Sequence, residues 1–151
     1  MKLIVMFKKI FSIILLFTAC NVFAADPIYT SFFSDLAIKG YDPVAYFKES
    51  KAVAGSKQFE FEWMGATWRF SSGENLNTFK ANPEKYSPQY GGYCAYAVSQ
   101  DSLAGIDPTQ FTIVNDKLYL NYNAKIQKEW LSKRDTYIKD ADKNWPAVLQ
   151  K

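Results

Sequence analysis

Alternating apolar and polar positions in the middle of the chain predict a β-hairpin. From residue 58 to residue 63 aromatic side chains alternate with polar ones, and the alternation resumes after Met64-Gly65 as far as Phe70. A period of two is typical of a half-buried strand. A two-residue turn between two such runs favours an antiparallel pair over residues 58–70.

Apolar residues at helical spacing follow this hairpin. Leu76 and Phe79 lie three positions apart, and Asn82-Pro83 closes the segment. Ser71 stands three residues before Glu74, a pattern that predicts a capping box with Ser71 as the N-cap and Glu74 bonding back to it. We therefore expect a helix between Ser71 and Asn82.

The last third of the chain repeats the order of hairpin and helix. Residues 111–114 and 118–121 flank the turn pair Asn115-Asp116 and predict a second hairpin. Apolar residues from 126 to 145 then recur at helical spacing. No repeat or internal linker interrupts this order, so we expect one α+β domain over residues 25–151, with two β-hairpins packed with several short helices.

The N-terminus has the three parts of a signal peptide. Lysines at positions 2, 8 and 9 precede an almost wholly apolar run from Ile10 to Ala19, and Val22-Phe23-Ala24 provides small or modest side chains at a cleavage site. The apolar run is well short of the roughly 20 residues that span a bilayer. We therefore expect cleavage after Ala24 and a periplasmic or secreted protein without a membrane span.

A second processing route starts from Phe17-Thr18-Ala19-Cys20, which resembles the box that precedes the lipid-modified cysteine of bacterial lipoproteins. Phe17 stands where that box usually has an aliphatic residue. A lipid anchor on Cys20 is therefore the alternative to plain cleavage.

Composition excludes several classes of function. Of 18 basic and 15 acidic residues, the three N-terminal lysines and no acid belong to the predicted signal, so the rest of the chain has 15 of each. A balanced charge gives no reason to expect a nucleic-acid partner. The chain has no histidine, which excludes His-based catalytic triads and His–metal sites.

The candidate chemistry lies in the segment from Ser87 to Ser99. Cys94 is the cysteine that remains after signal removal, and it follows the pair Gly91-Gly92. A glycine pair allows a close backbone approach, and a helix starting near Tyr93 would lower the pKa of the Cys94 thiol through its dipole. The alternative is a buried cysteine that packs as a small hydrophobe.

Two stretches carry a resemblance to a known family. The run WMGATWRFSSGENLNTFKANPEKY (residues 63–86) and the upstream GYDPVAYF (residues 40–47) are similar to the YHS domain, over about residues 38–90. Residues 91–151 resemble the extension of exported YHS proteins with a GGYCA segment, some of which have selenocysteine at the position of Cys94. This resemblance implies redox chemistry at Cys94.

The family is associated with binding of copper or other soft ions through cysteines. At the matching positions this chain has Ala45, Ser71 and Asn75, which lack the thiolates that soft metals prefer. We therefore expect no metal site at these positions and no cofactor. The alternative cofactor is copper, bound by Cys94 with methionine or backbone ligands, and Met64 is a candidate thioether.

Three function hypotheses remain from the sequence. The first is a redox-active thiol at Cys94, the one catalytic candidate, which needs a thiol-bearing protein or small thiol as partner. The second is a non-enzymatic module that binds copper or a small molecule. The third is a structural or interaction domain, in which Asp42 is a turn residue and the tyrosines at positions 41, 46, 90, 93 and 96 belong to the core and its hydrogen-bonded edge.

Overall fold

The structure is a computed structural model that describes residues 24–151. The predicted signal segment up to residue 23, with Cys20, lies outside the described residues. Within residues 24–151 no helix is long and apolar enough to cross a membrane.

Short helices and two hairpins make up the chain. The elements, in order, are η1 (Ala37–Gly40), α1 (Pro43–Lys48), β1 (Ser56–Trp63), β2 (Ala66–Phe70), α2 (Gly73–Ala81), α3 (Pro83–Tyr86), η2 (Gln89–Gly92), α4 (Ala95–Ser99), β3 (Asp107–Val114), β4 (Lys117–Asn121), α5 (Ala124–Ser132), α6 (Arg134–Asn144) and η3 (Ala147–Gln150). The predicted α+β class, with two hairpins and several short helices, is confirmed.

Both hairpins close through the predicted two-residue turns. Trp63 pairs with Ala66 around Met64-Gly65, and Val114 pairs with Lys117 around Asn115-Asp116. All four turn residues have positive φ, between 50° and 77°. Positive φ at both central positions gives a turn whose twist matches that of the two strands, so each turn sets the register of its hairpin.

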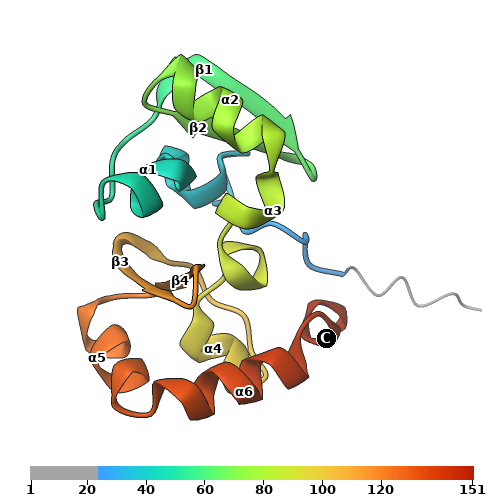
Figure 1. Cartoon of the computed structure of the whole chain (residues 1–151). Helices are drawn as coiled ribbons and strands as arrows, with labels where there is room; N and C mark the ends of the chain where they lie inside the picture. The colour runs from blue at the N-terminus through green and yellow to red at the C-terminus, as the bar shows by residue number, and fades with distance from the viewer. Residues whose placement is uncertain (1–23) are drawn as a thin grey trace, which may run out of the picture.

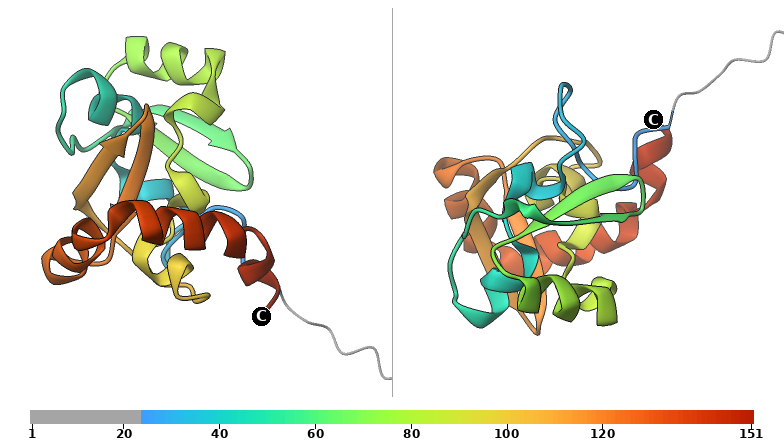
Figure 2. Two further views of the ribbon diagram at one scale, coloured as in Figure 1. Left: turned by 60° about the horizontal axis from the view of Figure 1, so that its bottom comes forward. Right: turned by 90° about the horizontal axis from the view of Figure 1, so that it is seen from above.

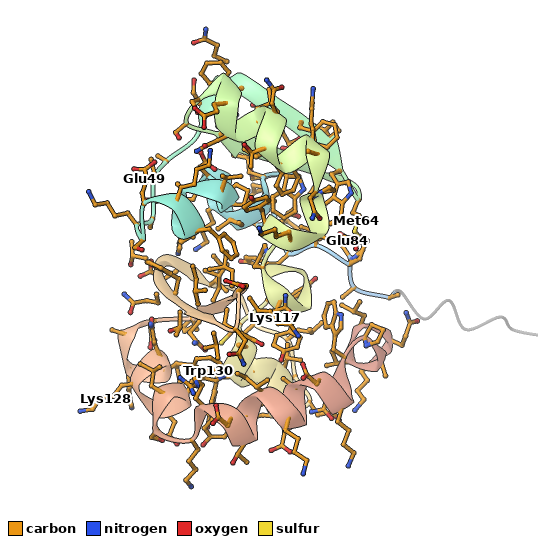
Figure 3. All side chains as sticks on the ribbon, in the orientation of Figure 1. Glu49, Met64, Glu84, Lys117, Lys128 and Trp130 are labelled. Atoms are coloured by element: carbon orange, nitrogen blue, oxygen red, sulfur yellow. The ribbon has the colours of Figure 1, made fainter. Side chains whose placement is uncertain are left out.

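The β3–β4 hairpin separates two apolar cores. In Figure 1, β1, β2 and α1 to α3 lie above this hairpin and α4 to α6 lie below it. Leu118 and Leu120 are fully buried in the upper core with Trp68. Tyr119, between them in sequence, belongs to the lower core, where it packs on Trp130 of α5 at 5.4 Å between ring centroids (Figure 3). Because successive side chains of β4 point to opposite faces, this one strand contributes apolar side chains to both cores.

The start of α2 differs from the prediction. Ser72, not Ser71, is the N-cap, and its hydroxyl accepts the backbone N–H of Asn75 at 3.1 Å. Glu74 does not bond back to the cap, because its carboxylate pairs with Lys48 at 2.7 Å. The capping box at Ser71 is therefore wrong by one residue, since a partner outside the helix holds Ser71.

The first described residues form a strap across the lower half, residues 25–29, which we call the N-terminal strap. The N–H of Ala25 donates to the carbonyl of Leu149 at 2.7 Å, and the N–H of Tyr29 donates to the carbonyl of Gly91 at 2.9 Å. The strap thereby connects the first described residues to η3 through Leu149 and to η2 through Gly91.

Candidate functional site

A buried carboxylate holds Ser71. Asp42 is fully buried and is the N-cap of α1, and its Oδ1 accepts the N–H groups of Val44 at 2.8 Å and Ala45 at 3.2 Å. Its Oδ2 accepts the N–H of Ser71 at 2.8 Å, the hydroxyl of Ser71 at 2.7 Å and the Nδ2 of Asn75 at 2.7 Å. We call these residues, Asp42 with Ala45, Ser71 and Asn75, the Asp42 hub.

The Asp42 hub gathers the three positions where the resemblance places cysteines. The sequence treated Asp42 as a turn residue, and it is also the centre that draws together Ala45, Ser71 and Asn75. Five donors occupy the two carboxylate oxygens, which leaves this carboxylate with little capacity for a further ligand. Within residues 24–151 no three His, Cys, Asp or Glu side chains come together as a metal site.

Cys94 lies in the other half of the sequence, at the start of α4. It is the N-cap of this helix, and its side chain is 1% exposed. Its N–H donates to the carbonyl of Ala104 at 3.0 Å, and its sulfur lies 3.6 Å from Oδ1 of Asn121 as a weak donor. The expected position at a helix start is confirmed, and the thiol is buried there.

The electrostatic prediction for Cys94 is wrong. Burial raises the pKa of the Cys94 thiol, because a thiolate loses hydration in an apolar environment. Backbone amides of Ala97, Tyr122 and Tyr96 act on the sulfur in the opposite direction without reversing the shift. Because desolvation outweighs these amides, the pKa of the Cys94 thiol stays above its ordinary value and the thiol is protonated at neutral pH.

A small apolar pocket opens beside this thiol, which we call the Cys94 pocket. It has a volume of about 180 Å³. Its lining consists of Cys94, Tyr96, Ala97, Ala104, Tyr122 and Ile126. Tyr122 is 55% exposed, whereas Cys94 is buried, so the tyrosine is the outer part of the lining and the thiol the inner part.

Asn121 supports the inner side of this site, and the sequence analysis did not single it out. It is fully buried at the end of β4, and its Oδ1 accepts the N–H of Tyr96 at 3.2 Å as well as contacting the Cys94 sulfur. Its Nδ2 has no hydrogen-bond partner among the described residues. A polar residue ending the otherwise apolar run 118–120 was the signal that could have identified it.

The glycine pair before Cys94 does not approach a ligand. A Cβ on Gly91 would lie 1.8 Å from the carbonyl oxygen of Pro27, in the N-terminal strap. Gly91 and Gly92 also have φ of +61° and +84°, which favours glycine. The close approach inferred from the sequence is therefore real, but the chain's own N-terminal strap makes it.

Tyrosines fill the core and its edge, as predicted for several of them. The hydroxyls of Tyr46, Tyr90 and Tyr93 donate to the carbonyl of Pro108, the carboxylate of Asp142 and the carbonyl of Asp26. Burial is the main cause that raises the pKa of all three. These three hydroxyls serve packing, and of the five predicted tyrosines Tyr96 is the one that lines the Cys94 pocket.

Met64 does not lie in the lining of the Cys94 pocket. It sits in the β1–β2 turn, 51% exposed, in the half of the molecule that holds the first hairpin (Figure 3). The copper alternative from the sequence would therefore use Cys94 with backbone ligands, without Met64 as a second soft ligand.

Comparisons with known proteins identify one region of the chain. Residues 44–90 match the family model of the YHS domain. No curated protein and no solved structure matches the chain. The matched region begins in α1 and ends in η2, so it contains all three positions that meet at Asp42, namely Ala45, Ser71 and Asn75. Asp42 itself lies two residues before the matched region, and Cys94 lies four residues after it.

Proposed function

We propose that this chain, which contains a YHS domain at residues 44–90, is an exported module that binds a small apolar or soft ligand in the Cys94 pocket. The observation that carries the proposal is the pocket itself, in which a buried, protonated thiol is the inner wall of an apolar hollow. The redox hypothesis, first in the sequence analysis, becomes the second candidate because burial raises the pKa of this thiol.

The size and lining of the Cys94 pocket support this ligand class. Apolar cavities of about 150 Å³ hold benzene-sized molecules, and this pocket has about 180 Å³. Tyr96, Ala97 and Ile126 offer apolar contact, and the thiol adds a polarisable sulfur. A small uncharged ligand fits such a site, whereas an anion would lose its hydration without a cation to replace it.

The Asp42 hub is a poor alternative as a ligand site, which supports assigning ligand binding to the Cys94 pocket. Its carboxylate is fully buried and accepts five hydrogen bonds from the chain itself. A ligand entering there would have to break bonds to a buried carboxylate, which is costly. We therefore assign the binding role to the Cys94 pocket and a structural role to the Asp42 hub.

Toluene is a suitable probe for this proposal. We expect saturating toluene to slow the reaction of native Cys94 with methyl methanethiosulfonate at least fivefold, because the ring would occupy the route to the sulfur. Ala97→Leu should remove this protection, since the larger side chain fills the pocket. Ala81→Leu is the matched control on α2, where Ala81 is exposed, and should keep the protection.

Two results would oppose the binding proposal. Native Cys94 that reacts at the same rate with and without toluene would show that no apolar ligand enters. Equal protection in wild type and Ala97→Leu would place the toluene elsewhere on the protein.

Redox chemistry is the second candidate, favoured by the backbone amides that act on the Cys94 sulfur. A thiolate attacking hydrogen peroxide would become a sulfenic acid and release hydroxide. A small thiol would then form a mixed disulfide with Cys94 and release water. Intact mass after brief peroxide treatment at pH 7 tests this, since the proposal needs one added oxygen in folded wild type and none in Cys94→Ser.

Export is the remaining part of the proposal, supported by the charged, apolar and small-residue segments before residue 25. The intact mass of protein from an exporting host should correspond to a chain that starts at or near Ala25. A diacylated chain starting at Cys20 would instead establish a lipoprotein, and a full chain that keeps Met1 would contradict export.

A further inference from the structure

A second hollow on the surface adjoins the Cys94 pocket, and we call it the outer hollow. It has a volume of about 480 Å³ and lies against α5. Tyr96 and Ile126 line both spaces, so these two side chains form their common boundary. Figure 2, left, shows α5 at the edge of the body, at the end of α6 that lies away from the C-terminus. A ligand in the Cys94 pocket can therefore extend past Tyr96 and Ile126 along α5.

The two spaces differ in the polarity of their linings. None of the described residues that line the Cys94 pocket is charged. The outer hollow has polar and charged side chains beyond the two shared residues, namely Lys125, Lys128, Glu129 and Ser132. An apolar pocket that opens into a polar hollow fits a molecule with one apolar end and one polar end.

Hydrogen bonds in the outer hollow show which of its polar groups the chain already uses. The hydroxyl of Ser132 donates to the backbone carbonyl of Glu129 at 2.6 Å, and the carboxylate of Glu129 accepts the hydroxyl of Tyr137 at 2.9 Å. Lys125 and Lys128 are exposed and form no ion pair with any residue of the described range 24–151. Two cations against one anion give this hollow a positive charge, which attracts an anionic group.

From these two linings we infer that the ligand of the Cys94 pocket is a small amphipathic carboxylate, whose apolar end lies beside the thiol and whose carboxylate faces Lys125 and Lys128 in the outer hollow. The inference rests on the proposed binding at Cys94 and names the class of ligand. A carboxylate in the open outer hollow keeps most of its hydration, so the ligand avoids the cost of burying a charge in the apolar pocket. Exposed ion pairs each contribute little, so the two lysines select among apolar ligands and the pocket supplies most of the affinity.

Two phenyl compounds that differ in charge test the inference. 4-Phenylbutyrate has a benzene-sized ring and a carboxylate joined by a short alkyl chain, and 4-phenylbutanol is its neutral counterpart. For each compound we would measure the concentration that halves the rate at which native Cys94 reacts with methyl methanethiosulfonate. The selectivity is the value for the alcohol divided by the value for the carboxylate.

Removing the two lysine charges should lower this selectivity. We expect it to fall about fivefold in Lys125→Gln/Lys128→Gln at low ionic strength, which corresponds to about 1 kcal/mol. Lys139→Gln/Lys143→Gln is the matched control, because it removes the same charge from exposed positions on α6 that line neither space. High salt should lower the selectivity of the wild type toward that of Lys125→Gln/Lys128→Gln, since salt screens exposed charges.

Charge reversal gives a second, independent measurement. In Lys125→Glu/Lys128→Glu, cationic 4-phenylbutylamine should protect Cys94 at a lower concentration than 4-phenylbutyrate, whereas the order should be the opposite in the wild type. Toluene, which has no charged end, should protect all of these variants equally. Equal toluene protection and equal melting temperatures would show that the substitutions leave the Cys94 pocket and the fold intact.

Two results would overturn this inference and leave the proposed function in place. One is protection by toluene and by both phenyl compounds with the same selectivity in wild type and Lys125→Gln/Lys128→Gln. The other is an equal fall of selectivity in Lys139→Gln/Lys143→Gln, which would assign the preference to the net charge of the protein. If neither toluene nor any phenyl compound slows the reaction of Cys94, the proposed function fails and this inference fails with it.

Discussion

Two short helices begin with a buried polar side chain, and their surroundings differ. Asp42 caps α1, and five hydrogen bonds from its own chain satisfy its carboxylate. Cys94 stands at the N-cap position of α4 without a side-chain capping bond, and its sulfur has a weak hydrogen bond to Asn121 and the influence of nearby backbone amides. The same sulfur lines the Cys94 pocket. The hydrogen-bonding capacity of the Asp42 carboxylate is used by the chain itself, whereas the pocket beside Cys94 has room for a ligand.

The asparagines next to the two sites show the same difference. Nδ2 of Asn75 donates to Asp42 at 2.7 Å, whereas Nδ2 of Asn121 is buried without a partner among the described residues. A saturated network stabilises a fold, and an incompletely satisfied one costs free energy that a purely structural site would avoid. The comparison therefore locates stability in the Asp42 hub and candidate function at Cys94.

Removing the hub carboxylate should have the largest effect. Asp42→Ala leaves the donors of Ser71 and Asn75 buried without an acceptor, so the free energy of unfolding should fall by roughly 3–5 kcal/mol. Urea unfolding measures this. Asp140→Ala, at an exposed position on α6, is the control and should change stability by less than about 0.5 kcal/mol. A similarly small loss in Asp42→Ala would show that the hub is not structural.

Substitutions of the two neighbouring serines should lower stability by different amounts, because their hydroxyls have different hydrogen-bond partners. Ser71→Ala removes a hydroxyl bonded to a buried carboxylate and should cost about 2 kcal/mol. Ser72→Ala removes the N-cap of α2 and should cost about 1 kcal/mol. Thermal unfolding of both variants gives the comparison, and a larger loss in Ser72→Ala would restore capping as the main role of this segment.

Alkaline pH tests the closed core around α1. Burial, the largest cause, raises the pKa of Tyr46, so the folded protein keeps this proton at pH values where the unfolded chain, with a pKa of about 10, releases it. The unfolded state then binds fewer protons, and stability falls as pH rises above about 10. The loss from one such tyrosine reaches about 1.4 kcal/mol by pH 11.

Tyr46→Phe should make the alkaline decline in stability less steep, measured by urea unfolding between pH 9 and pH 11, while the raised pKa values of Tyr90 and Tyr93 keep contributing to the decline. Identical curves for wild type and Tyr46→Phe would mean that the hydroxyl of Tyr46 reaches solvent in the folded protein.

Cys94→Ser should lower the free energy of unfolding by about 1 kcal/mol, far less than Asp42→Ala. The shorter hydroxyl remains close to Oδ1 of Asn121 and keeps an acceptor, although it is more polar than a thiol. If Cys94→Ser lowered the free energy of unfolding as much as Asp42→Ala in the same urea series, Cys94 would be as important to the fold as Asp42. The contrast between a structural hub and a binding pocket would then be weaker.

The sequence predicted what depends on local pattern. Both hairpins, their turns and the end of α2 at Asn82-Pro83 follow from periodicity and turn chemistry, and the short helix at Cys94 was also expected. The NPEKY motif forms α3, with Asn82 as its N-cap. These features need only neighbouring residues, so a single sequence contains the information for them.

Contacts between distant residues were not predictable in this way. Ser71 is 29 positions from Asp42, and a partner at that distance shifted the helix cap to Ser72. The N-terminal strap explains Gly91 from 64 positions away, and the packing of β4 buries Cys94 and raises its pKa.

The claim that Cys94, unlike the Asp42 hub, borders an apolar pocket is tested most directly by the reaction of native Cys94 with two thiosulfonates of different charge. In both reactions the thiolate sulfur forms a disulfide with the reagent and a sulfinate leaves. An apolar pocket beside a thiol of raised pKa predicts that neutral methyl methanethiosulfonate reacts at least a hundredfold faster than its anionic sulfonatoethyl analogue. It also predicts that the rate keeps rising with pH beyond about 9, and that in denaturant the two reagents approach equal rates. Equal rates on the folded protein, or a rate that is already constant at neutral pH, would contradict an apolar pocket beside a thiol of raised pKa at Cys94.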